Sequence, residues 1–465
     1  MKRGTEVTLD IEKFADQGKS LARTDGYVVF VPGAVPGDRV RARVVKSKKK
    51  YAEAMLLDVI APSELRTEPR CFYFDTCGGC KWQHVDYAAQ LEAKRMSVED
   101  ALRHTGGFRE AAALPTIGAE KTYFYRNKME FSFSASRWLT REEIASGRTF
   151  DTDFALGLHV PGSFEKVLDL RECHLQSELS VRLVNAVRDH AKTHELAPWH
   201  VRTHEGYLRH LVIRHGERTG EVMVNLVTNG YDAGKIAGLA GLLQETFPEV
   251  TTFVNTINTG VAQTAFGEEI RTIYGPGVIH DRIGPYRFEI APNAFFQTNT
   301  AQAERLYEVT RGFAGLRPDD LVYDLYCGAG TISLFLSGHA RHVVGVELVE
   351  EAVENARANA VMNGVSNCTF VSGDLMRLFT PDFVREHGRP DVLVVDPPRA
   401  GMHPKVVEQI ARLRPERFVY VSCNPQTQAR DLALLAGHYR VEAVQPVDLF
   451  PHTHHIESVV KLSLR

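Results

Sequence analysis

Several classes of protein are excluded by what this chain lacks. Its 465 residues contain no run of 18 apolar residues, so no ordinary membrane-spanning helix is expected. Residues 1–14 are polar and charged and lack the apolar centre of a signal peptide. No low-complexity tract occurs, and no segment indicates an obligate protein partner. We therefore expect a cytoplasmic protein with no membrane partner.

Excess charge is absent too, because the formal net charge is only −3. The local distribution is more informative than this total. Residues 39–50 hold seven Lys and Arg residues and no acid. A stripe of this kind attracts phosphates by counterion release, which would suit an RNA partner. A solvated strand edge would give the same pattern.

Cysteine is present but is not arranged for disulfides, which are rare in a reducing compartment. Four of the seven cysteines are candidate ligands of one metal site: Cys71, Cys77, Cys80 and Cys173. Their spacing allows either zinc or an iron–sulfur cluster. The other three cysteines fall in the C-terminal third of the chain.

The chain is too long for one core and divides into three predicted domains. Residues 1–62 contain short alternating runs separated by turns, typical of an OB-like RNA-binding β-barrel. Residues 63–275 predict an α+β central domain with the cysteine cluster and a helix over about 87–104, which could pack on the C-terminal domain. Residues 276–465 alternate strands with helices and predict a Rossmann-like α/β domain.

A glycine-rich turn follows the predicted strand 321–325 and indicates a bound cofactor. In Asp324-x-x-x-Gly328-x-Gly330 the glycines let the backbone pass close to a ligand. The dinucleotide pattern G-x-G-x-x-G is incomplete, which favours S-adenosylmethionine over NAD. Glu347, at the end of the next strand, can accept hydrogen bonds from both ribose hydroxyls. Asp374 could accept one from the adenine amino group.

Two motifs further along predict the reacting centre. Asp396-Pro397-Pro398-Arg399 ends a buried strand in a rigid turn. Amino-directed methyltransferases have a similar turn followed by an aromatic residue, and Arg399 in that place disfavours a flat amino substrate. Cys423 follows another strand, where a nucleophile can face the cofactor cleft.

A thiol nucleophile suits a carbon that is not nucleophilic by itself, such as carbon 5 of uracil. Thiolate addition to carbon 6 makes carbon 5 electron-rich, carbon 5 takes the methyl group, and a base then removes its proton. Residues 451–457 supply histidines and a carboxylate, and we choose Glu457 as the base. The histidines lack the H-x-x-x-H spacing of a helical zinc site.

These motifs together resemble the bacterial 23S rRNA (uracil-5-)-methyltransferases, RNA 5-methyluridine enzymes with a TRAM domain and an iron–sulfur cluster. The resemblance spans nearly the whole chain. It rests on the basic barrel, the cysteine cluster, Tyr125-Arg126-Asn127-Lys128, Asn293-x-x-x-Gln297-x-Asn299, the glycine turn, the two motifs above and Glu457.

The resemblance implies a class I methyltransferase domain with Cys423 as nucleophile and Glu457 as base. It implies a [4Fe-4S] cluster on the four cysteines. It also implies S-adenosylmethionine binding by Gln297, Tyr326, Glu347 and Asp396. Thr331 stands where some members have asparagine, and we include it among the donor contacts.

The expected reaction is therefore methylation of uridine carbon 5 in 23S ribosomal RNA, with the target base flipped out of its stack. Related transfer-RNA enzymes generally lack the TRAM domain and the cluster, so the additions here favour ribosomal RNA over transfer RNA. Cytosine-5 methylation is an alternative, but RNA enzymes of that type usually place the nucleophile in a Pro-Cys context. A further alternative is a non-catalytic iron–sulfur RNA-binding protein.

Overall fold

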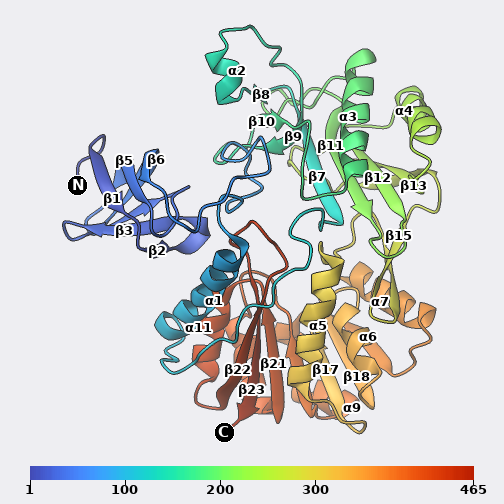
Figure 1. Ribbon diagram of the computed structural model, residues 1–465. Coiled ribbons are helices and arrows are strands. Elements are labelled where there is room, and N and C mark those ends of the chain that lie inside the picture. The colour runs from blue at the N-terminus through green and yellow to red at the C-terminus, as the bar shows by residue number, and fades with distance from the viewer.

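The computed structural model describes residues 1–465, and three sheets with separate cores dominate it. In Figure 1 the N-terminal sheet lies to one side, the central sheet lies at the top, and the C-terminal sheet lies below it. None of the helices combines the length and the apolar character needed to span a bilayer.

The N-terminal sheet has the order β1-β5-β6-β4-β3-β2, and β1 also contacts β3, so the sheet curls on itself. Alternate residues of β5 are buried in its core, as the alternating sequence predicts. Its strands are β1 (Glu6–Asp10), β2 (Lys13–Phe14), β3 (Ser20–Thr24), β4 (Tyr27–Val31), β5 (Arg39–Ser47) and β6 (Tyr51–Ala61).

The central sheet is mixed, with the order β14-β13-β12-β11-β7-β9-β10-β8. Apolar residues of α3 and α4 share a core with its central strands. The elements are β7 (Lys128–Ser134), β8 (Arg137–Trp138), α2 (Arg141–Ala145), β9 (Ala155–His159), β10 (Val167–Asp169), α3 (Glu178–Thr193), β11 (Leu208–His215), β12 (Val222–Thr228), α4 (Ala233–Thr246), β13 (Thr252–Ile257) and β14 (Glu269–Tyr274). A hairpin of β15 (Ile279–Ile283) and β16 (Tyr286–Ile290) then leads to the C-terminal domain.

The C-terminal sheet has the order β19-β18-β17-β20-β21-β23-β22, in which β17 to β21 are parallel and β23 runs antiparallel. Its strands are β17 (Leu321–Leu325), β18 (His342–Glu347), β19 (Cys368–Ser372), β20 (Val392–Val395), β21 (Arg417–Ser422), β22 (Tyr439–Val447) and β23 (Glu457–Leu464). Its helices are α5 (Thr300–Ala314), α6 (Thr331–Ser337), α7 (Glu350–Met362), α8 (Leu375–Leu378), α9 (Pro381–His387), α10 (Pro404–Leu413) and α11 (Pro425–Leu435).

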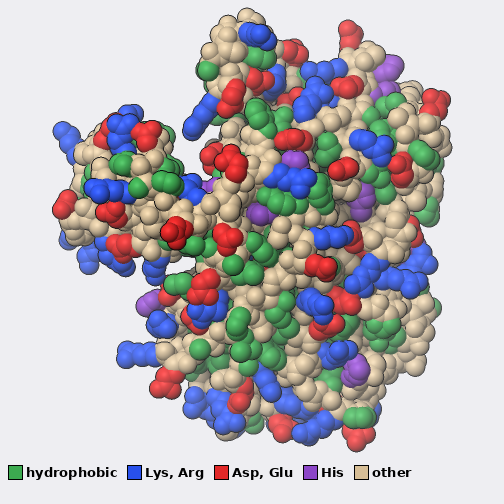
Figure 2. All heavy atoms as spheres, in the orientation of Figure 1, with side chains coloured by type: hydrophobic (Ala, Val, Ile, Leu, Met, Phe, Trp, Pro, Cys, Tyr) green, Lys and Arg blue, Asp and Glu red, His purple; other side chains and the backbone are tan.

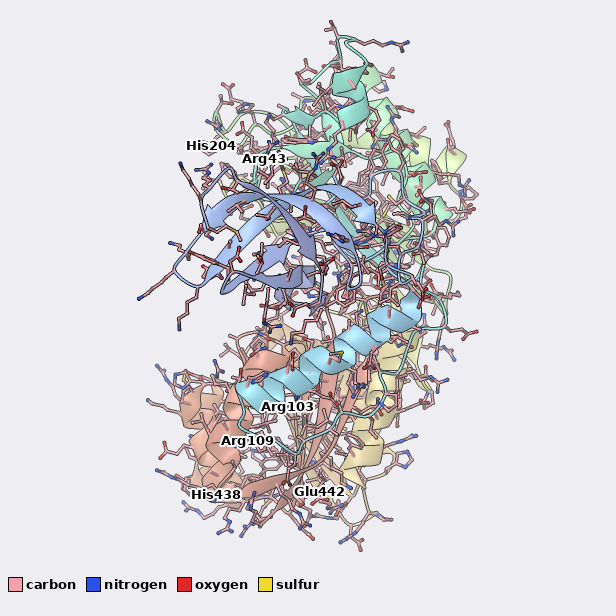
Figure 3. The ribbon with its side chains drawn as sticks, turned by 60° about the vertical axis from the view of Figure 1, so that its left-hand side comes forward. Arg43, Arg103, Arg109, His204, His438 and Glu442 are labelled. Atoms are coloured by element: carbon pink, nitrogen blue, oxygen red, sulfur yellow. The ribbon has the colours of Figure 1, made fainter.

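Both faces of this sheet are buried, which explains the continuous apolar strands. Along β20, Val392 and Val394 belong to one core, whereas Leu393 and Val395 belong to the other. α1 (Tyr87–His104) joins the second core although it lies far earlier in the chain. Figures 1 and 3 show α1 lying along the C-terminal domain, and it contacts α11. The expected helix over 87–104 therefore packs on that domain.

Candidate active site

The predicted site residues gather at one edge of the C-terminal sheet, where the parallel strands end. Glu347 is the last residue of β18, and Asp396 directly follows β20. Cys423 directly follows β21, the strand paired with β20. Ligands of open α/β sheets bind beyond this edge. The topology therefore brings together residues that are up to 76 positions apart in the chain.

Strand register places Cys423 opposite Glu457. Ser422 of β21 pairs with Ser458 of β23 in an antiparallel register. Cys423 follows Ser422 and Glu457 precedes Ser458, so both lie one position beyond this pair on the same side. Directly opposed residues of such strands have Cβ atoms about 4.5–5.5 Å apart. The thiol and the carboxyl are therefore cross-strand neighbours at the sheet edge.

The local sequence explains how the backbone around Cys423 is held. Asn424 caps α11 by accepting from the Gln426 N–H at 3.1 Å, and Pro425 occupies the first helical turn. The side chain of Asn424 also donates to the carbonyl of Arg399 at 2.9 Å, which ties the two predicted motifs together. Cys423 is thus fixed between a strand end and a helix N-terminus.

Burial governs the electrostatics of this edge. Glu457 is 4% exposed, and burial, with Asp396 adding, raises its pKa well above the usual range. Burial, with Glu457 and Asp396 adding, raises the pKa of Cys423 to about 12. The Arg399 guanidinium opposes both of these pKa shifts. A carboxyl with a raised pKa can take part in proton transfer near neutral pH.

The glycine turn after β17 approaches its neighbours closely. Gly330 has a φ of 76°, and a Cβ there would lie 2.9 Å from Cζ of Phe370. Tyr326 has a φ of 67°, unusual for a residue with a side chain. Such strained backbone is common where a protein binds a ligand. Asp324 is fully buried, accepts from Ser333 Oγ at 2.5 Å and has no partner for Oδ1.

Three of the predicted donor-binding residues lie near one another on the same side of the turn. Burial raises the pKa of Tyr326 to about 12, and the carboxylates of Asp374 and Glu347 contribute to that shift. Glu347 Oε2 accepts from the Gly328 N–H at 3.1 Å, so it helps to hold the turn. Asp374 caps α8 by accepting from the Met376 N–H at 2.9 Å.

The loop that carries Gln297 is held by Asn127, a residue of the Tyr125-Arg126-Asn127-Lys128 motif to which the sequence assigned no role. Asn127 Nδ2 donates to the carbonyl of Gln297 at 2.8 Å and to Thr300 Oγ1 at 2.9 Å. Thr300 in turn donates to the buried Asp281 at 2.6 Å. The Asn127 motif therefore connects the central domain to the loop that carries Gln297.

Thr331 has a partner that the sequence did not indicate. Its hydroxyl lies 2.9 Å from the hydroxyl of Tyr307, which is 2% exposed and comes from α5. The carboxyls of Asp396, Asp324 and Glu457 all act on the pKa of Tyr307. Tyr307 therefore belongs to the site, but in the sequence it is only one more core position of an amphipathic helix.

The four candidate cysteine ligands line a single pocket with mainly apolar walls. The Gly79 N–H donates to Cys77 Sγ at 3.4 Å, and Gln83 accepts from the Cys71 N–H at 3.1 Å. Burial raises the pKa values of Cys71 and Cys80 to about 12. No group of three or more His, Cys, Asp and Glu side chains is arranged to hold a metal ion. The pocket therefore gathers the thiols without the geometry of a mononuclear site.

The basic stripe of the barrel is less cationic than the sequence indicated. Its strand neighbours supply acids: Arg41 pairs with Asp58, and Arg43 lies 2.7 Å from Glu6. Figure 2 shows blue and red side chains interspersed over this domain. Acids that the sequence does not place beside the stripe therefore neutralise part of its charge. Lysines 48–50, at the turn into β6, are exposed and without acidic partners.

Two family comparisons cover the ends of the chain. Residues 278–465 match the family described as tRNA (Uracil-5-)-methyltransferase. Residues 1–57 match the TRAM domain.

Relatives match over nearly the full length. An uncharacterized RNA methyltransferase of Bacteroides thetaiotaomicron is 45% identical over 97% of this chain and 100% of its own. One of Porphyromonas gingivalis is 44% identical over 98% of this chain and 99% of its own. A solved structure of the tRNA (uracil-54, C5)-methyltransferase of Pyrococcus abyssi, in complex with S-adenosyl-L-homocysteine, is 28% identical with a TM-score of 0.77. It covers 98% of this chain and 100% of that chain, which confirms the predicted fold class.

Proposed function

Because the chain belongs to the RNA uracil-5-methyltransferase family, we propose that it methylates carbon 5 of a uridine in 23S ribosomal RNA. It is an S-adenosylmethionine-dependent RNA methyltransferase. The observation that carries the proposed mechanism is the strand register that sets Cys423 opposite Glu457.

Cys423 and Glu457 take the covalent and the proton-transfer steps. The Cys423 thiolate adds to carbon 6 of uracil, and the displaced π electrons pass through carbon 5 to the carbonyl oxygen. S-adenosylmethionine supplies an electrophilic methyl group. Carbon 5 takes that methyl group, and Glu457 then removes the proton from carbon 5. The electron pair of that C–H bond restores the double bond and expels the Cys423 thiolate.

Arg399 supports the first step. It is exposed, so it can reach a bound base, and its charge lowers the pKa of both Cys423 and Glu457. A guanidinium near the thiol favours the thiolate. The same group can stabilise negative charge that develops on the uracil carbonyl oxygen.

Donor binding is assigned to the residues around the glycine turn. The backbone of Tyr326 and Gly330, the carboxylates at the strand ends and the tethered Gln297 support this assignment. The assigned donor contacts are Gln297, Tyr326, Thr331, Glu347, Asp374 and Asp396. Thr331 would have to share its hydroxyl with Tyr307.

The cysteine pocket is assigned a [4Fe-4S] cluster. Four thiols that line one pocket supply the ligand set of such a cluster, which takes one ligand at each of four corners. The ligands would be Cys71, Cys77, Cys80 and Cys173. The group would cross-link residues 71–80 to Cys173 of the central domain.

We prefer ribosomal RNA to transfer RNA as the substrate because the chain has both a TRAM domain and a cysteine pocket, the combination on which the resemblance to 23S rRNA enzymes rests. With either substrate we propose that the protein acts in the cytoplasm. The Pyrococcus abyssi enzyme, which acts on tRNA, supports transfer RNA as the second candidate. In either case exposed lysines 48–50 would meet the phosphates.

The test is methyl transfer from labelled S-adenosylmethionine by anaerobically purified protein, with unmodified 23S RNA and transfer RNA offered separately. Nuclease digestion and mass spectrometry then identify the modified base. We expect 5-methyluridine in 23S RNA, lost in Cys423→Ala and retained in the matched control Cys368→Ser. Label only in transfer RNA would overturn the substrate, and label on cytosine would overturn the reaction.

A further inference from the structure

The loop that leads to Glu457 is buried. Residues 448–456, here called the base loop, connect β22 to β23. Asp448 and Leu449 are fully buried, and His452 and Thr453 are each 5% exposed. A buried loop must satisfy its backbone polar groups with protein partners instead of water. Those partners therefore decide where the loop, and with it Glu457, is held.

The segment that follows Cys80 supplies two of these partners. The backbone N–H groups of Lys81 and Trp82 donate to the carbonyl of His452 at 2.9 and 3.0 Å. These bonds begin one residue after a cysteine that lines the four-thiol pocket. Backbone bonds of this kind transmit a shift of residues 71–80, here called the cysteine loop, directly to His452.

The segment that precedes Cys71 contacts the same histidine from another side. The Arg70 guanidinium lies 5.3 Å from the ring centroid of Tyr123. The Tyr123 ring stacks on His452, with centroids 4.2 Å apart and planes 30° apart. Both flanks of the cysteine loop therefore lead to His452, one through the backbone and one through stacked side chains.

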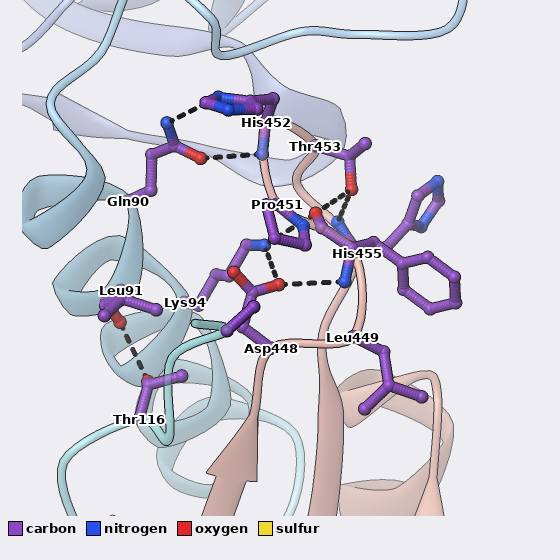
Figure 4. A network of polar contacts seen from close by, with 12 residues as sticks. Gln90, Leu91, Lys94, Thr116, Asp448, Leu449, Pro451, His452, Thr453 and His455 are labelled. Carbon is purple, nitrogen blue, oxygen red and sulfur yellow. Dashed lines mark hydrogen bonds and ion pairs between the residues drawn. The ribbon is translucent and has the colours of Figure 1, made fainter. Parts of the chain in front are cut away.

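Gln90 of α1 closes this arrangement, as Figure 4 shows. Its Oε1 accepts from the His452 N–H at 2.9 Å, and its Nε2 lies 3.2 Å from His452 Nδ1. The same Nε2 donates to the carbonyl of Trp82 at 3.0 Å. Gln90 is fully buried, so one side chain joins the base loop to Trp82, two residues after the cysteine loop.

The backbone of His452 is strained. Its φ is 64°, a conformation that residues with side chains rarely adopt. Strain of this kind persists only where the surroundings over-determine it, and it is concentrated at functional sites. His452 lies five residues before Glu457, and of the four residues between them Thr453 and Ile456 are buried and His454 and His455 are half-buried.

We propose that His452 is a positioning residue, which makes the position of Glu457 depend on the order of the cysteine loop. The inference rests on the proposed role of Glu457 as the base. The four-thiol pocket, on this account, acts on the chemistry by fixing the base loop, at a distance from the reacting carbon. Disturbing either the pocket or His452 displaces the carboxyl that removes the carbon-5 proton.

A displaced base affects one step more than the others. Addition of Cys423 and methyl transfer do not need Glu457, whereas loss of the carbon-5 proton does. The methylated covalent enzyme–RNA adduct therefore accumulates, and kcat falls while the Kd for the donor is kept. A misplacement of about 1 Å costs on the order of 100-fold in rate.

The experiment compares His452→Ala with His204→Ala in the full-length protein. His204, labelled in Figure 3, is a matched control because it is also a histidine with a left-handed backbone, φ 59°, and it is exposed on the central domain. Amide hydrogen exchange of residues 453–458 is measured first, without RNA or donor. Single-turnover kinetics, SDS-resistant adduct and iron content then follow.

We expect faster exchange of residues 453–458, adduct accumulation and a fall in kcat on the order of 100-fold in His452→Ala alone. The iron content should stay at the wild-type level. His452→Asn should recover part of kcat, because asparagine tolerates the left-handed backbone. Cys80→Ser should speed exchange in the same segment.

Unchanged exchange of residues 453–458 in His452→Ala would overturn the inference whether or not the enzyme acts on uridine. A loss of kcat equal to that of His204→Ala, or a parallel loss of donor affinity, would also overturn it. Failure of the wild-type protein to methylate uridine would instead overturn the proposed function, while the exchange result would still report on the link between the two loops.

Discussion

Replacing Lys94 by methionine should destabilise the C-terminal domain more than any comparable change of a surface lysine. Lys94 Nζ lies 2.6 Å from Asp448 Oδ1 and donates to the carbonyl of Phe450 at 3.0 Å. Both side chains of the pair are fully buried. Methionine keeps most of the volume of lysine but removes the charge, so Asp448 is left as an unpaired buried carboxylate.

Breaking a buried pair by removing one partner costs about 3–5 kcal/mol. Asp448 keeps two weaker partners, the hydroxyl of Tyr87 at 2.9 Å and the Phe450 N–H at 3.0 Å. These bonds place the expected loss nearer to about 3 kcal/mol. For a domain of this size that corresponds to a fall in Tm of roughly 6–12 °C.

Thermal unfolding of full-length Lys94→Met, Asp448→Asn and the double variant measures this cost. Lys13→Met is the matched control, because its exposed pair with Asp100, at 3.0 Å, should contribute less than about 1 kcal/mol. The double variant should recover at least half of the loss, since neither charge is then buried alone. A Lys94→Met variant no less stable than Lys13→Met, or a double variant less stable than both singles, would refute the reasoning.

Further predictions concern the acid cluster, the glycine turn and the barrel. Burial, with Asp324 adding, raises the pKa of Asp396 to about 7, so the protonated carboxyl stabilises the fold below about pH 4 and that stabilisation is lost as the pH rises through 7. Asp396→Asn should therefore raise the free energy of unfolding by about 2 kcal/mol at pH 8 but not at pH 4. Equal effects at both pH values would contradict this prediction. Gly330→Ala should lower the free energy of unfolding by about 1–3 kcal/mol and weaken donor binding measured by calorimetry. The control Gly437→Ala, at a position with open space around it, should leave both quantities nearly unchanged. Similar losses in the two variants would argue against a tight turn at Gly330. Exchanging lysines 48–50 for glutamine should make the slope of log K for RNA binding against log salt concentration shallower by about 2. Arg41→Gln, which removes a cation that is already paired, should change this slope little. A larger change in Arg41→Gln than in the lysine variant would contradict the assignment of the phosphate contacts to the lysines.

The sequence predicted those parts of the site whose geometry is local. The glycine turn after the strand 321–325 depends on residues within a few positions, and it occurs as expected. The helix after Cys423 was not predicted, although Asn424-Pro425 is a typical helix start. The family resemblance implied the roles of Cys423 and Glu457, but their opposition across two strands depends on strand register, which the sequence spacing could not give.

Contacts between segments that are far apart in the chain could not be predicted from the sequence. Lys94 and Asp448 are 354 residues apart, and each alone reads as an ordinary charged residue of a helix or a loop. Tyr307 reads as core, although it contacts Thr331. The partial neutralisation of the basic stripe was not predicted, because its acidic partners come from β1 and β6 and only the sheet pairing brings them alongside β5.

The central claim is that Cys423 bonds to carbon 6 and Glu457 removes the carbon-5 proton. The most direct test incubates Glu457→Gln with donor and RNA and analyses the product by denaturing electrophoresis and mass spectrometry. The account predicts an SDS-resistant adduct that carries the new methyl group on its uracil, and no such adduct in Cys423→Ala. Free 5-methyluridine formed at the wild-type rate by Glu457→Gln, or an adduct that persists without Cys423, would contradict it.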